Sequence, residues 1–518
     1  MYRWLCMALL LIPGLAVAAT PSPSAAKILM VAKVANGGSR WNNIHSLHLV
    51  GHIQRGGLAG AFQQSTNLRT GQWVMASKLG AFRVTSGFDG KLDWRAAPGG
   101  AVFEADAPHA KRVAVSQAFR NAYGWWRSRH WPAARRFLGV RECGRQTCDV
   151  IRMTPRGGTS FNLWINAHTH LVARIADHDY ALPRIVYYSN YRSVHGVKIP
   201  FRERVAIGTQ QHAATITLES VQANPAAAQP AYNPPAAHLA NFTFAGGKHS
   251  VTIPFRLLPG GHMLVSVKVN GHPMRFVVDS GSGGEGILTA HAAAIAGVHG
   301  AYAGKVSVTG KHAVKTGFAM VSRLQIGDEI ALHNEVVRIA ALPHARIDGT
   351  LGADFFARFV VRIDYRHRTM TLTSPRDFDA ADAGTLVPLL FSRGGVPLVQ
   401  GSFDGFGGVF EADTGGTILT LFTPFAKAHR LFARYQHVAV AHSEPGLGGG
   451  RLPYVRVHAG TLRMGRVALR NPAVEMSPVS IGFLGNRYVA GNIGGRIWAH
   501  FIVTFDDANH TLYLKPQA

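Results

Sequence analysis

Hydrophobic and polar residues alternate along much of the N-terminal part of the chain, for example at 160–165 and 212–218. Neighbouring side chains of a strand point to opposite faces of a sheet, so this period of two predicts strands with one buried face. Two other stretches, 24–36 and 112–127, are candidate helices. A succession of strands with few helices predicts a β-rich accessory domain over residues 20–222.

The alternation stops at residues 223–240. This segment is rich in alanine, has few apolar anchors and contains Pro225, Pro230, Pro234 and Pro235. Such a composition is typical of an extended, semi-rigid spacer. We therefore expect a linker here, with a separate C-terminal region after it.

The C-terminal region contains an internal repeat. Three blocks recur in the same order with similar spacing: 276–281 with 410–415, 324–327 with 462–465, and 349–372 with 491–514. In the longest block, eight of the 24 aligned positions are identical. This pattern indicates a duplicated β lobe, which we place at residues 241–380 and 381–518. Two similar lobes can pack around a pseudo-twofold axis with a cleft between them.

Each lobe contains an apolar strand followed by an Asp-Ser/Thr-Gly sequence. These sequences begin at Asp279 and Asp413, and Leu-Gly or Ile-Gly follows later in each lobe. Glycine allows a tight backbone turn beneath the aspartate, and the hydroxyl of Ser or Thr can tie the loop down. One such sequence is a common turn. Two of them at equivalent places in a duplicated lobe predict two carboxylates on one axis.

The paired motifs resemble those of the aspartic protease family, in particular bacterial retropepsin-like proteins with two lobes in one chain. The resemblance implies that Asp279 and Asp413 form a catalytic dyad that shares one proton and activates a water to hydrolyse peptide bonds. It also implies supporting roles for neighbouring residues. These are Ser280, Gly281, Ser282, Thr414 and Gly415 in the loops, and Leu351, Gly352, Ile493 and Gly494 behind them.

Gly310 and Gly448 are candidate flap tips. Each lies 17 residues before a glycine of the repeat, Gly327 or Gly465. Hairpin tips at these places would fold over the cleft, exclude water and hold a peptide extended. Ordinary flexible turns are the alternative interpretation.

Two residues depart from the family pattern. Gly416 lacks the hydroxyl that the resemblance places after the second Asp-Thr-Gly. Glu411 adds a third carboxylate two positions before Asp413, where the first lobe has Val277. The principal hypothesis is therefore an aspartic endopeptidase, and the alternative is a non-catalytic envelope protein, a pseudoprotease, that binds peptide or lipid.

The N-terminal domain resembles the half-barrel of lipoprotein carriers of the LolA/LolB type. The resemblance lies in the succession of strands and in residues 87–94 and 195–201. It implies a concave apolar face that could hold a lipid or another hydrophobic ligand. A structural prodomain or spacer is the alternative interpretation.

Residues 1–19 have the pattern of a signal peptide. Arg3 precedes an apolar run, and small residues follow it. The run is too short to span a membrane, and no later segment is apolar enough. We therefore expect a bacterial protein that is periplasmic or secreted, without a transmembrane segment after cleavage. In an oxidising compartment Cys143 and Cys148 would form a disulfide, and two unpaired thiols are the alternative.

The composition supports the expected fold class and limits the kinds of partner that we expect. The 57 glycines and 26 prolines favour many turns, in keeping with a mainly β protein. The net charge of +26 is dispersed, and the densest basic cluster, 127–136, lies in no recognisable nucleic-acid module, so we expect no nucleic acid. His168 and His170 lie on one face of a predicted strand, but they lack a third metal ligand.

We therefore expect no metal and no cofactor. The expected fold is a two-lobed, aspartic-protease-like β domain preceded by a β-rich half-barrel. It is expected to act as a monomer on a peptide or protein substrate.

Overall fold

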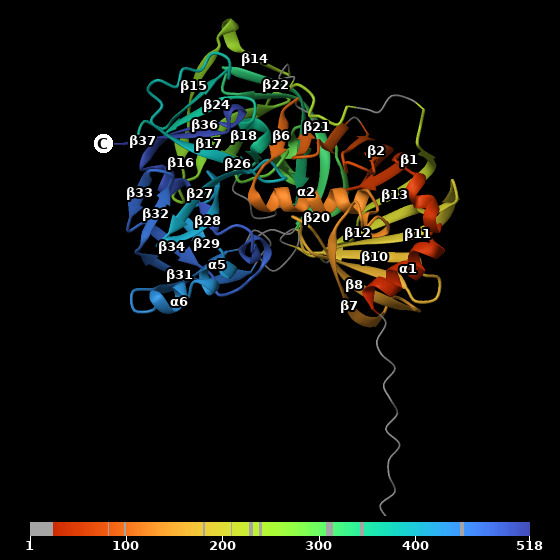
Figure 1. The fold of residues 1–518 in the computed structure, drawn as a ribbon. Coiled ribbons are helices and arrows are strands. Elements are labelled where there is room, and N and C mark those ends of the chain that lie inside the picture. Colours follow the sequence, from red (N-terminus) through yellow and green to blue (C-terminus); the bar gives the residue numbers. More distant parts are fainter. Residues whose placement is uncertain are drawn as a thin grey trace, which may run out of the picture.

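The computed structural model describes residues 24–80, 82–97, 100–179, 182–208, 210–226, 231–237, 241–306, 314–341, 347–445 and 450–517. The expected signal peptide and both expected flap tips, Gly310 and Gly448, lie outside the described residues. The described part is mainly β, as the sequence predicts (Figure 1).

One antiparallel sheet of thirteen strands forms the N-terminal domain, in the spatial order β6-β5-β4-β3-β2-β1-β13-β12-β11-β10-β9-β8-β7. Two meanders therefore meet where β1 pairs with β13. The strands are β1 (Ser46–Arg55), β2 (Leu58–Asn67), β3 (Trp73–Leu79), β4 (Phe82–Phe88), β5 (Asp93–Ala96), β6 (Val102–Ala105), β7 (Ala133–Glu142), β8 (Thr147–Pro155), β9 (Phe161–Asn166), β10 (Val172–Asp177), β11 (Arg184–Val194), β12 (Val197–Ile207) and β13 (Gln210–Ala223).

Two helices accompany this sheet. Helix α1 (Ala25–Ala35) confirms the first candidate helix, and the Ser24 side chain caps it by accepting a hydrogen bond from the N–H of Lys27 (3.2 Å). Helix α2 (Pro108–Asn121) begins earlier than predicted, because Pro108 suits the first helical turn. It lies across the sheet (Figure 1), and Phe119 in its last turn packs in the same apolar core as strand residues such as Phe161.

The expected disulfide between Cys143 and Cys148 is confirmed, and it joins the ends of β7 and β8. The histidine pair lies elsewhere than predicted. The sequence places His168 and His170 on a strand, but β9 ends at Asn166, whose side-chain oxygen accepts a hydrogen bond from the N–H of His168 (2.9 Å). This side-chain bond stabilises a turn in place of further strand.

The C-terminal region consists of short strands in two further sheets. In the first half these are β14 (Phe242–Phe244), β15 (Ser250–Pro254), β16 (Arg256–Leu257), β17 (Met263–Val269), β18 (His272–Val278), β19 (Ile287–Thr289), β20 (Ala301–Val306), β21 (Val314–Ile326), β22 (Ile330–Ala340), β23 (Gly349–Leu351), β24 (Val360–Asp364) and β25 (Thr369–Thr373). In the second half they are β26 (Thr385–Phe391), β27 (Pro397–Phe403), β28 (Phe406–Ala412), β29 (Leu419–Leu421), β30 (Val440–Pro445), β31 (Arg451–His458), β32 (Thr461–Met464), β33 (Val467–Arg470), β34 (Ala473–Met476), β35 (Gly491–Ile493), β36 (Phe501–Asp506) and β37 (Thr511–Pro516).

The two halves pair their strands in the same way. Strand β18 is parallel to β23, and β28 is parallel to β35. The short helices α4 (Ala353–Phe356) and α7 (Gly495–Trp498) follow β23 and β35 at aligned positions of the sequence repeat. The hairpins β24–β25 and β36–β37 join through β24 and β36, so both halves share one sheet and one apolar core.

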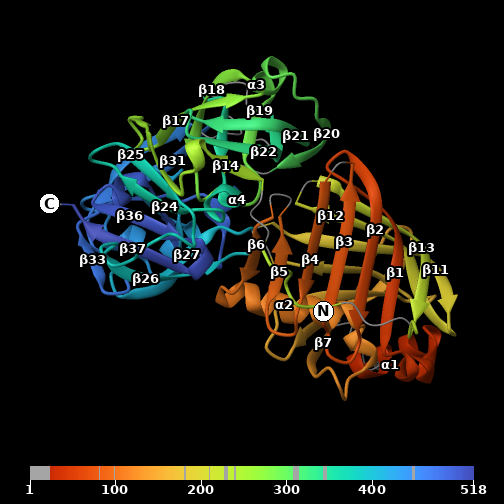
Figure 2. The same cartoon turned by 90° about the horizontal axis from the view of Figure 1, so that it is seen from above.

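The N-terminal domain contacts the C-terminal region where β6 meets β26 and β13 meets β20, and through side chains of β5 and α2 (Figure 2). Arg95 on β5 donates to Asp354 of α4 (3.0 Å) and lies 3.9 Å from Glu285. Arg393, in the turn after β26, pairs with Asp93 at 2.8 Å. Burial alone would raise the pKa of Glu285, but nearby arginines, Arg95 first, hold it below its usual value. The interface therefore depends on buried charges that need their partners.

Ring stacking and hydrogen bonds extend the same interface. The ring of His109 on α2 stacks on Tyr488 with centroids 3.4 Å apart. The backbone N–H of Phe391 donates to Asp106 (2.6 Å). Within the expected linker, the carbonyl of Tyr232 accepts a hydrogen bond from the Trp94 indole (2.8 Å). The N-terminal sheet is thus held against the first and second halves at once.

Replacing Arg95 by alanine should lower the free energy of unfolding by about 3 kcal/mol, because Asp354 and Glu285 would stay buried without that cation. Chemical denaturation at neutral pH measures the change. Arg83→Ala, at an exposed position of β4, is the matched control. Equal stability of the two variants would show that the interface does not depend on this ion pair.

Candidate active site

The two predicted aspartates begin equivalent loops. Asp279 follows β18 and Asp413 follows β28. The backbone N–H of Asp279 donates to the carbonyl of Leu351 (2.9 Å), and that of Asp413 donates to the carbonyl of Ile493 (3.1 Å). Leu351 and Ile493 are also buried. They therefore hold the loops through their backbone as well as through packing.

Gly352 and Gly494 allow two stretches of backbone to approach closely. A β-carbon on Gly352 would lie 2.8 Å from the carbonyl oxygen of Ser282, and one on Gly494 would lie 2.5 Å from the carbonyl carbon of Gly416. Both distances are too short for any side chain, so only glycine fits behind the loops. This is the physical reason for the repeated Leu-Gly and Ile-Gly pairs.

Ser280 and Thr414 tie the loops to each other. The N–H of Ser280 donates to Thr414 Oγ1 (3.0 Å), and the N–H of Thr414 donates to Ser280 Oγ (3.0 Å). Each hydroxyl then donates to a carbonyl of the opposite half, Ser280 to Ala412 (2.6 Å) and Thr414 to Val278 (2.9 Å). Because both side chains are fully buried, water cannot compete for these four bonds.

The next residue of each loop lies under the carboxyl group of the other loop. A β-carbon on Gly281 would lie 2.4 Å from Cγ of Asp413, and a β-carbon on Gly415 would lie 2.3 Å from Cγ of Asp279. Both glycines therefore leave room for a carboxyl group that comes from the opposite half. The structure thus brings Asp279, Gly281, Asp413 and Gly415 together.

The proximity of the two carboxyls changes their chemistry. Burial, and then the charge and hydrogen bond of Asp413, raise the pKa of Asp279 well above its usual value. The N–H of Ser282 donates to Asp279 Oδ1 (3.0 Å) and acts in the opposite direction. Two carboxylates this close cannot both be ionised cheaply, so the pair is suited to hold one proton.

A third contact at Asp413 comes from Asn492, which the sequence analysis missed. Its amide donates to Asp413 Oδ2 (2.7 Å), while the N–H of Gly415 donates to Oδ1 (2.8 Å). A β-carbon on Gly416 would lie 2.9 Å from this amide nitrogen. Gly416 is therefore the residue that makes room for Asn492. The sequence repeat could have identified this residue, because Asn492 aligns with Thr350 of the first half and differs from it in side-chain chemistry.

Glu411 lies on the same strand as the second aspartate loop. Along β28 its neighbours Phe410 and Ala412 are fully buried in the core, whereas Glu411 and Val409 are only partly buried. Burial, and then the charge of Asp413, raise the pKa of Glu411 to about 8. The third carboxylate is thus electrostatically linked to the aspartate pair.

The candidate flap regions are antiparallel hairpins as far as the structure describes them. Strands β20 and β21 pair up to Val306 and Val314, and β30 and β31 pair up to Pro445 and Arg451. The hairpin in each half has the same place in the strand order along the sequence. Whether the tips act as flaps stays a prediction.

One group of side chains has a spacing that could suit a metal ion, namely His442, Glu444 and Glu475. Arg456 pairs with Glu475 and lies 3.6 Å from Glu444, so a cation is already present. We interpret the group as an ion-pair network on β30, β31 and β34.

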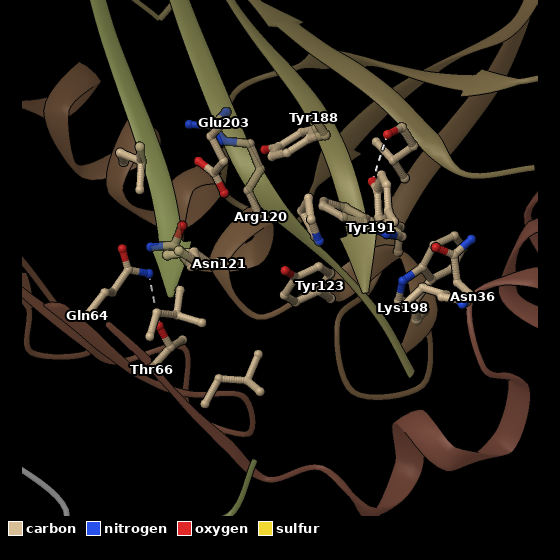
Figure 3. A pocket seen from close by; sticks show the side chains of 18 of the residues that line it. Asn36, Gln64, Thr66, Arg120, Asn121, Tyr123, Tyr188, Tyr191, Lys198 and Glu203 are labelled. Atoms are coloured by element: carbon tan, nitrogen blue, oxygen red, sulfur yellow. Dashed lines mark hydrogen bonds between the residues drawn. The ribbon is translucent and has the colours of Figure 1, made fainter. Parts of the chain in front are cut away.

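A pocket lies inside the curved N-terminal sheet (Figure 3). Tyr123, Tyr188, Tyr191 and Glu203 gather around it. Its volume of about 90 Å³ is below the roughly 300–1,000 Å³ of sites for drug-sized ligands. Burial also raises the pKa of Glu203 to about 7. The pocket is thus small and carries polar groups, and a lipid ligand stays a prediction.

Among known protein families, one family model matches a segment of the C-terminal region. Residues 265–355 match a family model described as aspartyl protease. No curated protein sequence matches the chain. The matched segment contains the first aspartate loop and its backing Leu-Gly pair.

Solved structures give distant likenesses. A retropepsin-like aspartic protease from Rickettsia conorii shares 22% identity, with 24% of this chain and 90% of that chain covered and a TM-score of 0.20. A putative outer membrane lipoprotein-sorting protein domain from Vibrio parahaemolyticus shares 9% identity, with 40% and 96% covered and a TM-score of 0.30. A LolA superfamily protein from Nitrosomonas europaea shares 11% identity, with 39% and 95% covered and a TM-score of 0.28.

Replacing Gly415 by alanine should lower the free energy of unfolding by about 1–3 kcal/mol, because the added methyl group would overlap the Asp279 carboxyl. Thermal or chemical denaturation measures this. Gly407→Ala on β28 is the control, since a β-carbon there would meet no atom within 4 Å. If both variants were equally stable, the loops would not be packed as closely as described.

Glu411 should make the protein less stable as the pH rises. Its folded pKa of about 8 exceeds the ordinary value of 4.5, so the folded state binds more protons between these values and loses stability as they leave. Glu411→Gln should therefore show a smaller fall in the free energy of unfolding between about pH 4.5 and about 8. Glu142→Gln, at an exposed position, should behave as wild type. Parallel pH curves for all three proteins would contradict the assigned burial.

Proposed function

We propose that this protein, which carries an aspartyl protease family domain over residues 265–355, is an exported aspartic endopeptidase with Asp279 and Asp413 as its dyad. The observation that carries the proposal is the crossed arrangement of the loops. Each carboxyl lies over the glycine of the opposite loop, and Ser280 and Thr414 lock the two loops together. Both halves of one chain thus contribute one carboxyl each to a single site.

In the proposed reaction the dyad holds one proton and one water. The ionised carboxylate takes a proton from the water, whose oxygen attacks the carbonyl carbon of the peptide bond. The protonated carboxyl gives its proton to the carbonyl oxygen as the tetrahedral intermediate forms. The carboxyl that took the water's proton then gives it to the leaving nitrogen, and one hydroxyl of the intermediate returns its proton to the other carboxylate. The C–N bond breaks, and the dyad again holds one proton.

The pair titrates as a unit, but its surroundings are unequal. Asp413 accepts hydrogen bonds on both oxygens, from Gly415 and Asn492, and such donors suit a carboxylate. Asp279 has the raised pKa. These contacts distinguish the two carboxyls, and the shared proton belongs to the pair.

The substrate is proposed to be an extended peptide or a flexible protein segment. The hairpins β20–β21 and β30–β31 have equivalent places in the two halves and would cover such a chain. Closing over the peptide would exclude bulk water from the dyad.

Export to the periplasm or the medium is part of the proposal. The disulfide between Cys143 and Cys148 favours an oxidising compartment. Within the described residues, no helix is both long and apolar enough to cross a membrane.

Asp279→Asn and Asp413→Asn should each lower peptide cleavage at least about a thousandfold, because either change removes one half of the acid–base pair. Cleavage of a diverse peptide pool from acidic to neutral pH, read by mass spectrometry, measures this. Asp377→Asn, at a position 43% exposed, is the control, and circular dichroism checks folding of all variants. A wild-type rate in either folded dyad variant would refute the mechanism.

A further inference from the structure

A cavity of about 580 Å³ lies between the N-terminal domain and the second half of the C-terminal region. Its walls are largely apolar. They include Trp94, Phe103 and Val113 from the N-terminal domain, and Leu398, Val409 and Glu411 from β27 and β28. This volume is within the roughly 300–1,000 Å³ of small-ligand sites. The cavity therefore has room for at least one long side chain.

The cavity adjoins the dyad through strand β28. Val409 and Glu411 line it, and the next residue in this alternation is Asp413. Leu398, which is paired with Glu411 in the neighbouring strand, also lines the cavity. A peptide held at the dyad would therefore present a neighbouring side chain to this wall.

Glu411 is the acid of this wall that lacks a partner. Among the residues that the structure describes, none forms a hydrogen bond or ion pair with its carboxyl. The other charged or titratable groups that line the cavity are Arg55, Asp93, Arg95, His109, Asp179, Arg393 and Tyr488. Several of these already have partners: Arg95 pairs with Asp354, Arg393 with Asp93, and Asp179 with Arg120.

We propose that Glu411 is a specificity-determining residue that selects substrates with a lysine or arginine next to the scissile bond, whose cationic end enters this cavity. The inference rests on the proposed peptidase function and names its substrate class. The apolar walls suit the methylene chain of such a side chain, and the carboxyl of Glu411 suits its charged end. Glu411 is partly buried and carries a proton below about pH 8, and a cation bound beside it favours the carboxylate, so the proton leaves to solvent as the ion pair forms.

The preference applies to one side of the scissile bond. The position of the first half that matches Glu411 is Val277, which is apolar and buried. The two strands that lead to the dyad thus differ at this position: β28 has the carboxyl group of Glu411, and β18 has the methyl groups of Val277. A substrate with one basic residue and one apolar residue around the cut matches both.

The first arm of the test measures cleavage. Wild type, Glu411→Gln and Glu411→Val are given peptides from the pool's cut sites that carry either lysine or norleucine beside the cut. We expect the ratio of kcat/KM for lysine over norleucine to fall at least about tenfold in both variants. Glu142→Gln is the matched control and should keep the wild-type ratio. Wild-type cleavage without a preference for lysine or arginine would overturn the inference and leave the proposed function intact.

The second arm measures binding without cleavage. Asp279→Asn, immobilised, is exposed to the same randomised peptide pool, and the retained peptides are sequenced by mass spectrometry. Enrichment of lysine and arginine that disappears in the Asp279→Asn, Glu411→Gln double variant is the expected result. Absence of that enrichment would overturn the inference even if the wild type cleaved no peptide, an outcome that would separately refute the proposed function.

Discussion

Two carboxyl groups held face to face in a buried site are the constraint on which the rest of this molecule depends. The fold must overcome their mutual repulsion, and it does so because the two loops cross. Ser280 and Thr414 exchange hydrogen bonds between backbone and side chain, and these bonds hold the loops together. The glycines behind and beside the carboxyls follow from the same constraint, because any β-carbon there would occupy the space of a neighbour. The duplicated strand pairing of the two halves supplies the symmetry that makes this crossing possible.

The differences between the halves are as informative as their likeness. Asn492 in place of Thr350 gives Asp413 a second hydrogen-bond donor, and Gly416 makes room for it. Glu411 in place of Val277 adds an acid beside the same carboxyl and opens onto the cavity under the N-terminal domain. All of these changes fall on the Asp413 side. The N-terminal domain closes that side, so it forms part of the wall that a substrate would meet.

Much of this could be predicted from the sequence. The alternation predicts a mainly β chain, the spacing predicts helix α1 and the disulfide, and the repeat selects both aspartate loops. Contacts between distant segments could not be predicted: Asn492 reaches Asp413 only because β35 pairs with β28, and Arg95 meets Asp354 only after the domains dock. The histidine pair was misplaced because the strand ends at Asn166, whose side-chain oxygen accepts a hydrogen bond from the N–H of His168. The half-barrel resemblance implies a concave apolar face for a ligand, and this stays a prediction; the pocket at the tyrosines and Glu203 has a volume of about 90 Å³.

The central claim is that Asp279 and Asp413 form one coupled pair that shares a proton. Carbon-13 NMR of the protein labelled at aspartate carboxyls, recorded over a pH titration, tests it most directly. The account predicts one carboxyl that stays protonated well above the ordinary aspartate pKa of about 3.9 and that titrates at lower pH in Asp413→Asn. Two carboxyls that titrate independently near the ordinary value, unchanged by the other's replacement, would contradict it.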